Sequence, residues 1–222
     1  MTETPTTSKK KILIVDDHPV VREGLALRIS RQPDLEVCGE AGDVAEALQV
    51  LGHVRPDVAI IDIALKSGSG LDLIKRVKAR DESVRMLVWS MYSETHYAER
   101  ALRAGALGYI TKEQATEKII EAIRRVQAGK VYLSEEMAEQ LLGRAVGGGG
   151  TLAQPLLATL SDRELEVFRM IGEGLDTAQV AAQMRLSPKT VETYRARIKE
   201  KLHLTSSREL LRQAVQWLGQ SG

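Results

Sequence analysis

The stretch KILIVDDHPV, residues 11–20, joins four apolar residues to two adjacent aspartates, Asp16 and Asp17. The run Ile12–Val15 is short and continuously apolar, which is typical of a strand covered on both faces in a parallel sheet. Two neighbouring carboxylates repel each other, and this costs stability unless a cation offsets it. Mg²⁺ takes carboxylate oxygens and often lies beside phosphate, so a metal site is one interpretation. A solvated loop after the strand is the other.

Length and composition fit a soluble globular protein with one large domain or two modest ones. The chain has 222 residues, 43% hydrophobic and 27% charged, with a net charge of +1. It contains no apolar run long enough to span a bilayer, and residues 1–9 lack the apolar core of a secretory signal, so we expect no membrane partner and a disordered tail. The single cysteine, Cys38, excludes an intramolecular disulfide and favours a cytoplasmic location.

Strand-like and helix-like segments alternate in the first part of the chain. Five such units predict a flavodoxin-like α/β fold, a five-stranded parallel sheet with helices on both faces. The expected strands are Ile12–Asp16, Leu35–Glu40, Val58–Asp62, Met86–Ser90 and Leu107–Ile110. The expected helices are Pro19–Arg31, Val44–Leu51, Gly70–Ala79, Glu94–Ala104 and Ala115–Ala128.

The alternation ends after Gly129. A short helix, Ser134–Arg144, is expected with Ser134 as its cap, and the four glycines 147–150 predict a flexible linker. Beyond residue 156 only helix patterns remain, which indicates a separate all-α domain. Its expected helices are Asp162–Gly172, Thr177–Met184, Pro188–Leu202 and Ser206–Leu218, with a capping box at Ser161 and Glu164 and a cap at Ser187. We therefore expect domains at 10–130 and 156–222, joined by residues 131–155.

Further polar residues follow the expected strands of the first domain. Asp62, Ser90 and Lys112 each lie at or just after a strand end. Because the carboxyl ends of parallel strands share one edge of the sheet, these side chains should converge with Asp16 and Asp17. Three acids, a hydroxyl and a lysine suit a metal ion and a transferred phosphoryl group. One carboxylate would be the nucleophile, and Ser90 and Lys112 would neutralise the phosphoryl oxygens.

The first domain resembles the receiver domain of bacterial two-component response regulators over about residues 10–130. The resemblance rests on VDDH at 15–18, Asp62, Trp89-Ser90 and the run GALGYITK at 105–112. It implies that Asp62 accepts a phosphoryl group from a sensor histidine kinase. The only catalysis it implies is this self-catalysed transfer and the later self-catalysed loss of the phosphoryl group to water. It also implies a switch pair, Ser90 and Tyr109, in which the hydroxyl moves toward the phosphoryl group and the ring turns inward.

The same resemblance implies a Mg²⁺ site. Asp17 and Asp62 would bind the ion directly, Asp16 largely through water, and Ala64 through its backbone carbonyl. Two positions depart from the common receiver pattern, because neither the residues after Asp62 nor Glu113, which follows Lys112, supply the proline often found there. A cis bond before a residue other than proline is costly, so none is expected at Glu113.

The second domain contains a helix-turn-helix pattern. A helix at Thr177–Met184, a short turn and a longer helix from Pro188 have the required spacing, and Val191, Ile198 and Leu202 form one apolar stripe on the longer helix. Residues 188–202 include five basic and two acidic side chains. A solvated helix face would also explain this charge, but not the preceding helix and turn.

This segment resembles the LuxR-type helix-turn-helix of NarL/FixJ-class response regulators over about residues 160–218. The matching residues include RELEV at 163–167, Gly174-Leu175 and SPKTVETYRARIKEKL at 187–202. The resemblance implies that the longer helix enters the major groove of promoter DNA. The expected base-facing residues are Glu192, Thr193 and Ala196, and the expected phosphate-facing residues are Lys189, Thr190, Arg195, Arg197 and Lys199. Glu192 replaces a basic residue often found there, and a glutamate can accept a hydrogen bond from cytosine N4.

Three functions compete. The first is a phosphorylation-controlled transcription factor that dimerises when phosphorylated, with a histidine kinase, promoter DNA and RNA polymerase as candidate partners. The second is a phosphohydrolase with an aspartyl-phosphate intermediate. Its haloacid-dehalogenase form carries Asp-x-Asp on one strand, whereas here the candidate nucleophile Asp62 is on a different strand from Asp16 and Asp17. The third, a receiver that is never phosphorylated, should lack an acid or the lysine, and none is missing.

The end of the last helix is also rich in apolar residues. Leu210, Leu211, Ala214, Val215 and Leu218 recur at helical spacing, and some of them should cover the domain core. Trp217 lies off that stripe, so we expect it to be partly exposed, with a dimer contact as the alternative interpretation.

Overall fold

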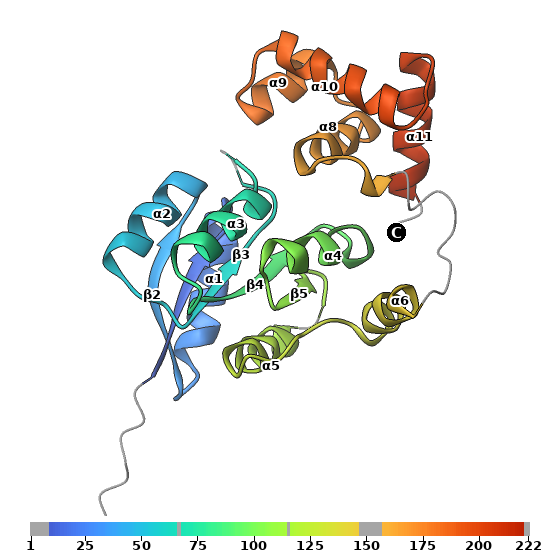
Figure 1. Cartoon of the computed structure of the whole chain (residues 1–222). Coiled ribbons are helices and arrows are strands. Elements are labelled where there is room, and N and C mark those ends of the chain that lie inside the picture. Colours follow the sequence, from blue (N-terminus) through green and yellow to red (C-terminus); the bar gives the residue numbers. More distant parts are fainter. Residues whose placement is uncertain (1–8, 66–67, 115, 147–156, 220–222) are drawn as a thin grey trace, which may run out of the picture. The chain divides into compact units, whose positions relative to one another are not determined.

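The structure is a computed structural model that describes residues 9–65, 68–114, 116–146 and 157–219. The chain divides into two compact units after Ala138 (Figure 1). The described residues do not include most of the expected tail, the glycine run 147–150 or residues 66–67, which follow β3 and Asp62. Within the described ranges, none of the helices combines the length and the apolar character that a membrane span requires.

The first unit is built on a five-stranded sheet in the order β2-β1-β3-β4-β5. All neighbouring strands run parallel, as the sequence predicts. The strands are β1 (Lys10–Val15), β2 (Leu35–Ala41), β3 (Val58–Ile61), β4 (Arg85–Ser90) and β5 (Gly108–Thr111). Tyr132 extends the sheet beyond β5 through an isolated parallel bridge to Gly108. The strand order reverses between β1 and β3, which is where open α/β sheets bind ligands.

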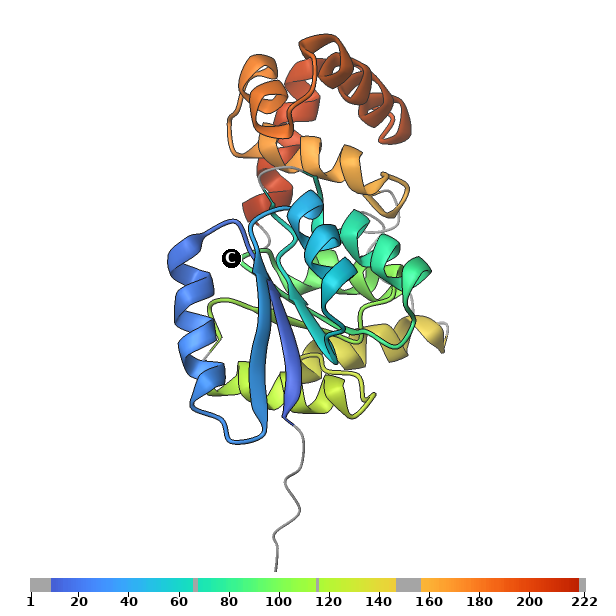
Figure 2. The same cartoon turned by 90° about the vertical axis from the view of Figure 1, so that its left-hand side faces the viewer.

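Helices cover both faces of this sheet (Figure 2). The five helices are α1 (Pro19–Ser30), α2 (Val44–His53), α3 (Gly70–Arg80), α4 (Glu94–Ala104) and α5 (Thr116–Gln127). One core forms where α1 and α5 pack on alternate strand residues, such as Ile12, Ile14 and Ile60. The next residues along β1, Leu13 and Val15, are equally buried on the face toward α2. The continuous apolar strands are therefore explained by burial on both faces.

A short helix, α6 (Glu135–Ala145), follows the sheet, and its first turn belongs to the first unit. The Ser134 hydroxyl accepts the backbone N–H of Met137, 3.1 Å away, so Ser134 caps this helix as predicted. Met137 is buried, whereas Leu142 and Val146 are exposed.

The second unit contains α8 (Asp162–Gly172), α9 (Thr177–Met184), α10 (Pro188–Lys201) and α11 (Ser207–Gly219). The predicted capping box at Ser161 and Glu164 and the cap at Ser187 are confirmed. Asp176 and Gln179 form a second capping box, at the start of α9. Each of these caps satisfies backbone N–H groups that a helix leaves unpaired at its first turn, so the helix starts are fixed locally.

Trp217 corrects one expectation. Trp217 is only 6% exposed, and its ring packs at a tilt of 48° against Phe168 of α8, with 5.5 Å between the ring centroids, so Trp217 is part of the domain core. Leu210 and Ala214 are buried with it, at intervals of four and three residues along α11. Leu211 and Val215 lie one residue further around the helix and are 44% and 51% exposed. The apolar residues of α11 therefore form two stripes, one inward and one outward.

Candidate functional site

The strand ends bring the predicted acids, hydroxyl and lysine together. Ser90 Oγ donates to Asp62 Oδ1 at 2.6 Å, and Lys112 Nζ lies 2.6 Å from Asp62 Oδ2. The same lysine nitrogen lies 2.5 Å from Asp16 Oδ2. Carboxylate oxygens of Asp16, Asp17 and Asp62 lie within 4.8 Å of one another. The five residues thus form one cluster at the carboxyl edge of β1, β3, β4 and β5.

Burial controls the electrostatics of this cluster. Asp62 is 2% exposed, and the side chain of Lys112 is 7% exposed. Burial raises the pKa of Asp62, and the charge of Lys112 works against that shift. Burial alone would lower the pKa of Lys112, but the attraction of Asp62 and Asp16 outweighs it and raises the pKa. Lys112 therefore stays charged beside the carboxylates that it holds.

The loop after β3 positions the Asp62 carboxylate. The backbone N–H of Ala64 donates to Asp62 Oδ1 at 3.2 Å, and Ala64 bridges to Ser69. A Cβ on Gly70 would lie 2.0 Å from the Asp62 carbonyl oxygen, so only glycine allows α3 to begin this close to Asp62. The described residues contain no cis peptide bond, and the Lys112–Glu113 bond is trans as expected.

Two residues outside the predicted set complete the acid cluster. His18 Nδ1 lies 2.7 Å from Asp17 Oδ1, and the His18 backbone N–H donates to Asp16 Oδ1 at 2.9 Å. Arg22 Nη1 donates to the Asp16 carbonyl at 2.5 Å. His18 follows the two aspartates directly, so its closeness in sequence could have indicated its position. Arg22 is one turn into α1, and the sequence carries no such signal for it.

The donor set of this cluster fits a hard divalent cation. Its three carboxylates and the neighbouring imidazole each offer one ligand atom within 4.8 Å of the others. Asp16 and Asp62 are almost fully buried, whereas Asp17 and His18 are more exposed, so the cluster is open on one side. Oxygen ligands at an accessible edge are what Mg²⁺ requires, because it keeps several of its waters.

The predicted switch residues lie next to the same cluster. Tyr109 on β5 is fully buried, and its hydroxyl donates to the carbonyl oxygen of Tyr92 at 2.8 Å. Burial raises the pKa of Tyr109 well above its usual value, and a hydrogen bond with Ser90 opposes that shift. The backbone N–H of Tyr92 lies 3.4 Å from Ser90 Oγ. Asp62, Ser90, Tyr92 and Tyr109 are thus polar neighbours.

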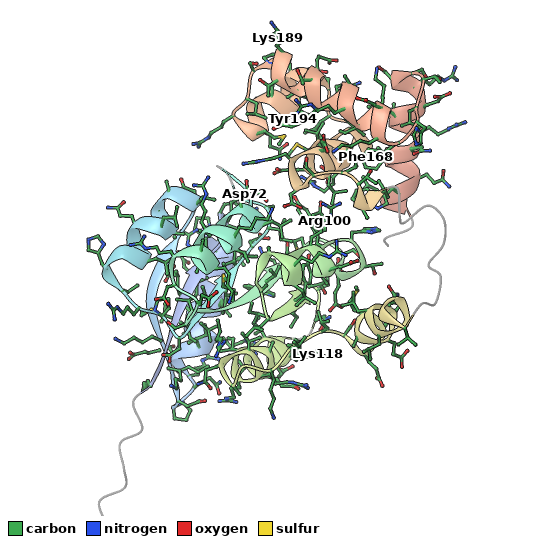
Figure 3. All side chains as sticks on the ribbon, viewed as in Figure 1. Asp72, Arg100, Lys118, Phe168, Lys189 and Tyr194 are labelled. Carbon is green, nitrogen blue, oxygen red and sulfur yellow. The ribbon has the colours of Figure 1, made fainter. Side chains whose placement is uncertain are left out.

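The helical unit presents the predicted DNA-contacting residues along α10. Val191, Ile198 and Leu202 are buried as predicted, which turns the opposite side of the helix outward. Lys189, Glu192, Thr193, Ala196 and Arg197 are exposed, and Thr190, Arg195 and Lys199 are partly buried. A shallow hollow in the surface is lined by Ser187, Lys189, Thr190, Thr193, Tyr194 and Arg197. Figure 3 shows Lys189 at the outer surface of this unit and Phe168 among its helices.

The fold and its two sites define a class of protein: a regulator with an acidic phosphoacceptor domain and a helix-turn-helix domain. Residues 12–124 match the model of the response regulator receiver domain, and residues 158–214 match that of the LuxR family of bacterial regulatory proteins. The chain belongs to the response regulators with a LuxR-type DNA-binding domain. Proteins of this family regulate transcription and are not classical enzymes.

Similar proteins cover almost the whole chain. The transcriptional activator protein ExaE of Pseudomonas putida is 38% identical over 92% of this chain and 95% of its own length. RcsB from Salmonella enterica serovar Typhimurium, solved bound to promoter rprA in the presence of phosphomimetic BeF₃⁻, is 25% identical over 92% of this chain and 98% of that one, with a TM-score of 0.65. A further structure holds two RcsB dimers on two parallel DNAs, at 25% identity and a TM-score of 0.56, over 92% of this chain and 97% of that one.

Proposed function

We propose that Asp62 accepts a phosphoryl group from a sensor histidine kinase and that this controls promoter binding. One observation carries the assignment: both oxygens of the Asp62 carboxylate face a hydrogen-bond donor, Ser90 on one side and Lys112 on the other, at 2.6 Å each. Those two donors are placed to neutralise the charge of a phosphoryl group on the same carboxylate. A carboxylate held only for structure would have no need of neighbouring acids.

The transfer is a displacement at phosphorus. An oxygen of Asp62 attacks the phosphorus of the kinase's phosphohistidine, the P–N bond breaks, and its electron pair remains on the imidazole nitrogen. Lys112 holds the ionised form of Asp62, which is the nucleophilic form, against the effect of burial. Hydrolysis of the aspartyl phosphate by water returns the carboxylate and releases inorganic phosphate, so the cycle needs no further reactant.

We propose Mg²⁺ as the bound metal, with Asp16, Asp17, Asp62 and the Ala64 carbonyl as its ligands. The ion would supply positive charge against the phosphoryl oxygens. The chain's own residues do the remaining work: Asp16 is fixed by Lys112, and Asp17 is fixed by His18. The His18 backbone N–H, which donates to the Asp16 carboxylate, and the Arg22 guanidinium, which donates to the Asp16 carbonyl, hold the turn that carries both aspartates.

Intact-mass measurement after incubation with acetyl phosphate and Mg²⁺ tests the acceptor. The wild-type chain should gain one phosphoryl group, and Asp62→Asn should gain none. Asp81→Asn, at a half-buried aspartate just after α3, is the matched control and should be phosphorylated like the wild type. A chelator should stop the reaction. Full phosphorylation of Asp62→Asn would show that the acceptor is another residue.

For the helical unit we propose that α10 enters the major groove of promoter DNA. Glu192, Thr193 and Ala196 would face bases, and Lys189, Thr190, Arg195, Arg197 and Lys199 would lie nearer the phosphates. The five basic residues of α10 support this orientation, and so does the hollow that Lys189 and Arg197 line. Selection of duplexes from a random library by the acetyl phosphate-treated protein tests it. A protein that selects no sequence would contradict this assignment.

We further propose that two phosphorylated copies bind paired half-sites. The 156–222 segment carries ten basic and eight acidic residues, so a single domain neutralises few phosphates and should bind weakly. Two domains on one duplex gain effective concentration. Leu211 and Val215 on α11 offer an exposed apolar pair that a second copy could cover. RNA polymerase is the expected further partner where binding activates transcription.

A further inference from the structure

The carboxylate of Glu192 is held by a residue of the preceding helix. Thr177, the first residue of α9, donates its hydroxyl to Glu192 Oε1 at 2.6 Å. The Nε of Arg195 lies 3.6 Å from the same oxygen. The Glu192 side chain is 60% exposed, but that of Arg195 is only 16% exposed. An outward-facing glutamate is therefore fixed from two sides by less exposed groups.

This arrangement prepares Glu192 for a specific contact. A free glutamate side chain on a helix surface loses rotamer entropy when it is ordered. Thr177 orders the Glu192 side chain before DNA binds, so the free energy of binding does not include that entropy loss. Both contacts engage Oε1, so Oε2 stays available as a hydrogen-bond acceptor.

The charge of Arg195 answers the main objection to an acidic residue facing DNA. A lone carboxylate close to the phosphates would be repelled, but Arg195 lies beside Glu192 and is its one cation partner within the described residues. The guanidinium offsets the negative charge without leaving the helix surface. The remaining oxygen of Glu192 is an acceptor only, so it can pair with an amino group on a base edge but not with guanine O6 or N7.

We propose that Thr177 and Arg195 are positioning residues that hold Glu192 as a reader of an amino group in the major groove, with cytosine N4 as the preferred partner. This inference rests on the proposed function, in which α10 contacts base edges. It adds the residue that sets specificity at one base pair and the two residues that act through it.

The competing interpretation is that the Thr177–Glu192 bond only joins α9 to α10. The two roles differ in what they change. A bond that only joins the helices would alter the unfolding midpoint or the affinity for all sequences alike. A positioning bond would alter the preference at one base pair and leave the phosphate contacts, and hence the salt dependence of binding, unchanged.

The experiment uses the full-length protein treated with acetyl phosphate and Mg²⁺. Duplexes are selected from a random library, and dissociation constants are then measured for the selected site and for each single-base-pair change. Thr177→Val removes the hydroxyl at constant shape, and Thr177→Ser is the matched control that keeps it. We expect Thr177→Val to lose about fivefold to tenfold of the discrimination at one base pair, the factor that one hydrogen bond provides.

Three further measurements complete the test. Glu192→Ala should abolish preference at the same base pair, and Thr177→Val should cost nothing more in the Glu192→Ala background. Arg195→Lys should weaken that preference more than it weakens binding to unrelated duplexes. Unchanged preference in Thr177→Val, with the wild type still selecting a site, would overturn the inference alone. A wild-type protein that selects no site would overturn the proposed function, and this inference with it.

Discussion

The carboxylate of Glu94, the first residue of α4, accepts the backbone N–H of Ser134 at 2.9 Å. Ser134 is the cap of α6, so a buried acid on one helix fixes the start of another that is forty residues away in sequence. The preceding residues are fixed as well, because the Tyr132 carbonyl accepts the N–H of Tyr109 at 2.9 Å. The start of α6 is thereby tied to α4 and to β5, the strand that carries Tyr109.

Removing this acid should loosen the first turn of α6. In Glu94→Ala the Ser134 N–H loses its partner in a partly buried position, which costs about 1–3 kcal/mol. We expect amide hydrogen exchange in the segment 134–138 to become at least about fivefold faster. Glu94→Gln, whose amide oxygen can still accept the bond, is the control and should exchange nearly like the wild type. Equal exchange in Glu94→Ala and the wild type would show that other contacts hold α6.

Phosphorylation should act through the same tie if the switch pair moves. Ser90 and Tyr109 lie on the path between Asp62, the proposed acceptor, and Tyr132. Exchange in α6 should therefore change on treatment with acetyl phosphate in the wild type and change less in Glu94→Ala. The wild type and Glu94→Ala should both still gain one phosphoryl group by intact mass. This separates a loss of coupling from a loss of phosphorylation.

His96 on α4 gives the first unit a pH-dependent stability. Burial lowers the pKa of His96 to about 4 from its usual 6.5. Between these two values the unfolded chain binds more protons than the folded chain, so the free energy of unfolding should fall as the pH drops from 6.5 toward 4. The fall is measured as the urea midpoint of unfolding at each pH in this range, with hydrogen exchange of the sheet amides as the probe of the first unit. The free energy of unfolding of His96→Gln should fall less steeply over this pH range. That of His53→Gln, at an exposed histidine of α2, should match the wild type.

Glu164 should stabilise the helical unit. Its carboxylate is buried, receives the Ser161 N–H at 2.7 Å and lies 2.6 Å from Lys201 Nζ. Burial alone would raise the pKa of Glu164, but the hydrogen bonds from Lys201 and Ser161 outweigh it and lower the pKa. Glu164→Gln should therefore lower the free energy of unfolding by about 1.5–3 kcal/mol at pH 7, the range for a hydrogen bond to a charged group. Glu200→Gln, at an exposed site, should lose less than about 0.5 kcal/mol.

The sign of the pH effect gives a second check. Because the folded pKa of Glu164 is depressed, its contribution is present above its usual value of about 4.3 and is lost as the pH falls through the folded value. The difference between the wild type and Glu164→Gln should therefore shrink in acid. Trp217 fluorescence reports on this unit when Trp89, the only other tryptophan, is replaced by phenylalanine. A difference that persists at pH 2 would mean that packing, not charge, is responsible.

The sequence alone was sufficient for the sheet and its acid cluster. Apolar runs that end in Asp16, Asp62 and Ser90 repeat in phase with the helices, and the geometry of a parallel sheet then brings their ends to one edge. The bonds from Glu94 to Ser134 and from Thr177 to Glu192 join positions whose separation has no periodic signal. Such contacts depend on rotamers and on loop paths, and the sequence pattern constrains neither of them.

Trp217 shows a second limit of the sequence. Two apolar stripes lie next to each other on α11, and helical spacing cannot tell which of them packs inward. Trp217 packs inward because Phe168 offers it an aromatic partner in the core, which leaves Leu211 and Val215 outside. A buried Trp217 cannot supply the dimer contact that was its alternative interpretation, and this outer pair is the candidate in its place.

The last prediction follows from that exposed pair. If Leu211 and Val215 join two DNA-bound copies, replacing both by serine should weaken binding to paired half-sites by about 100-fold, since linked sites gain two to four orders of magnitude over single ones. Binding to one half-site should not change, because neither residue lies on α10. Gln213→Ser with Gln216→Ser, at exposed positions of the same helix, is the control. The measurement is a salt titration on one and on two half-sites with acetyl phosphate-treated protein. Equal losses on both duplexes would place the pair's role in folding, and no loss would exclude α11 from the dimer contact.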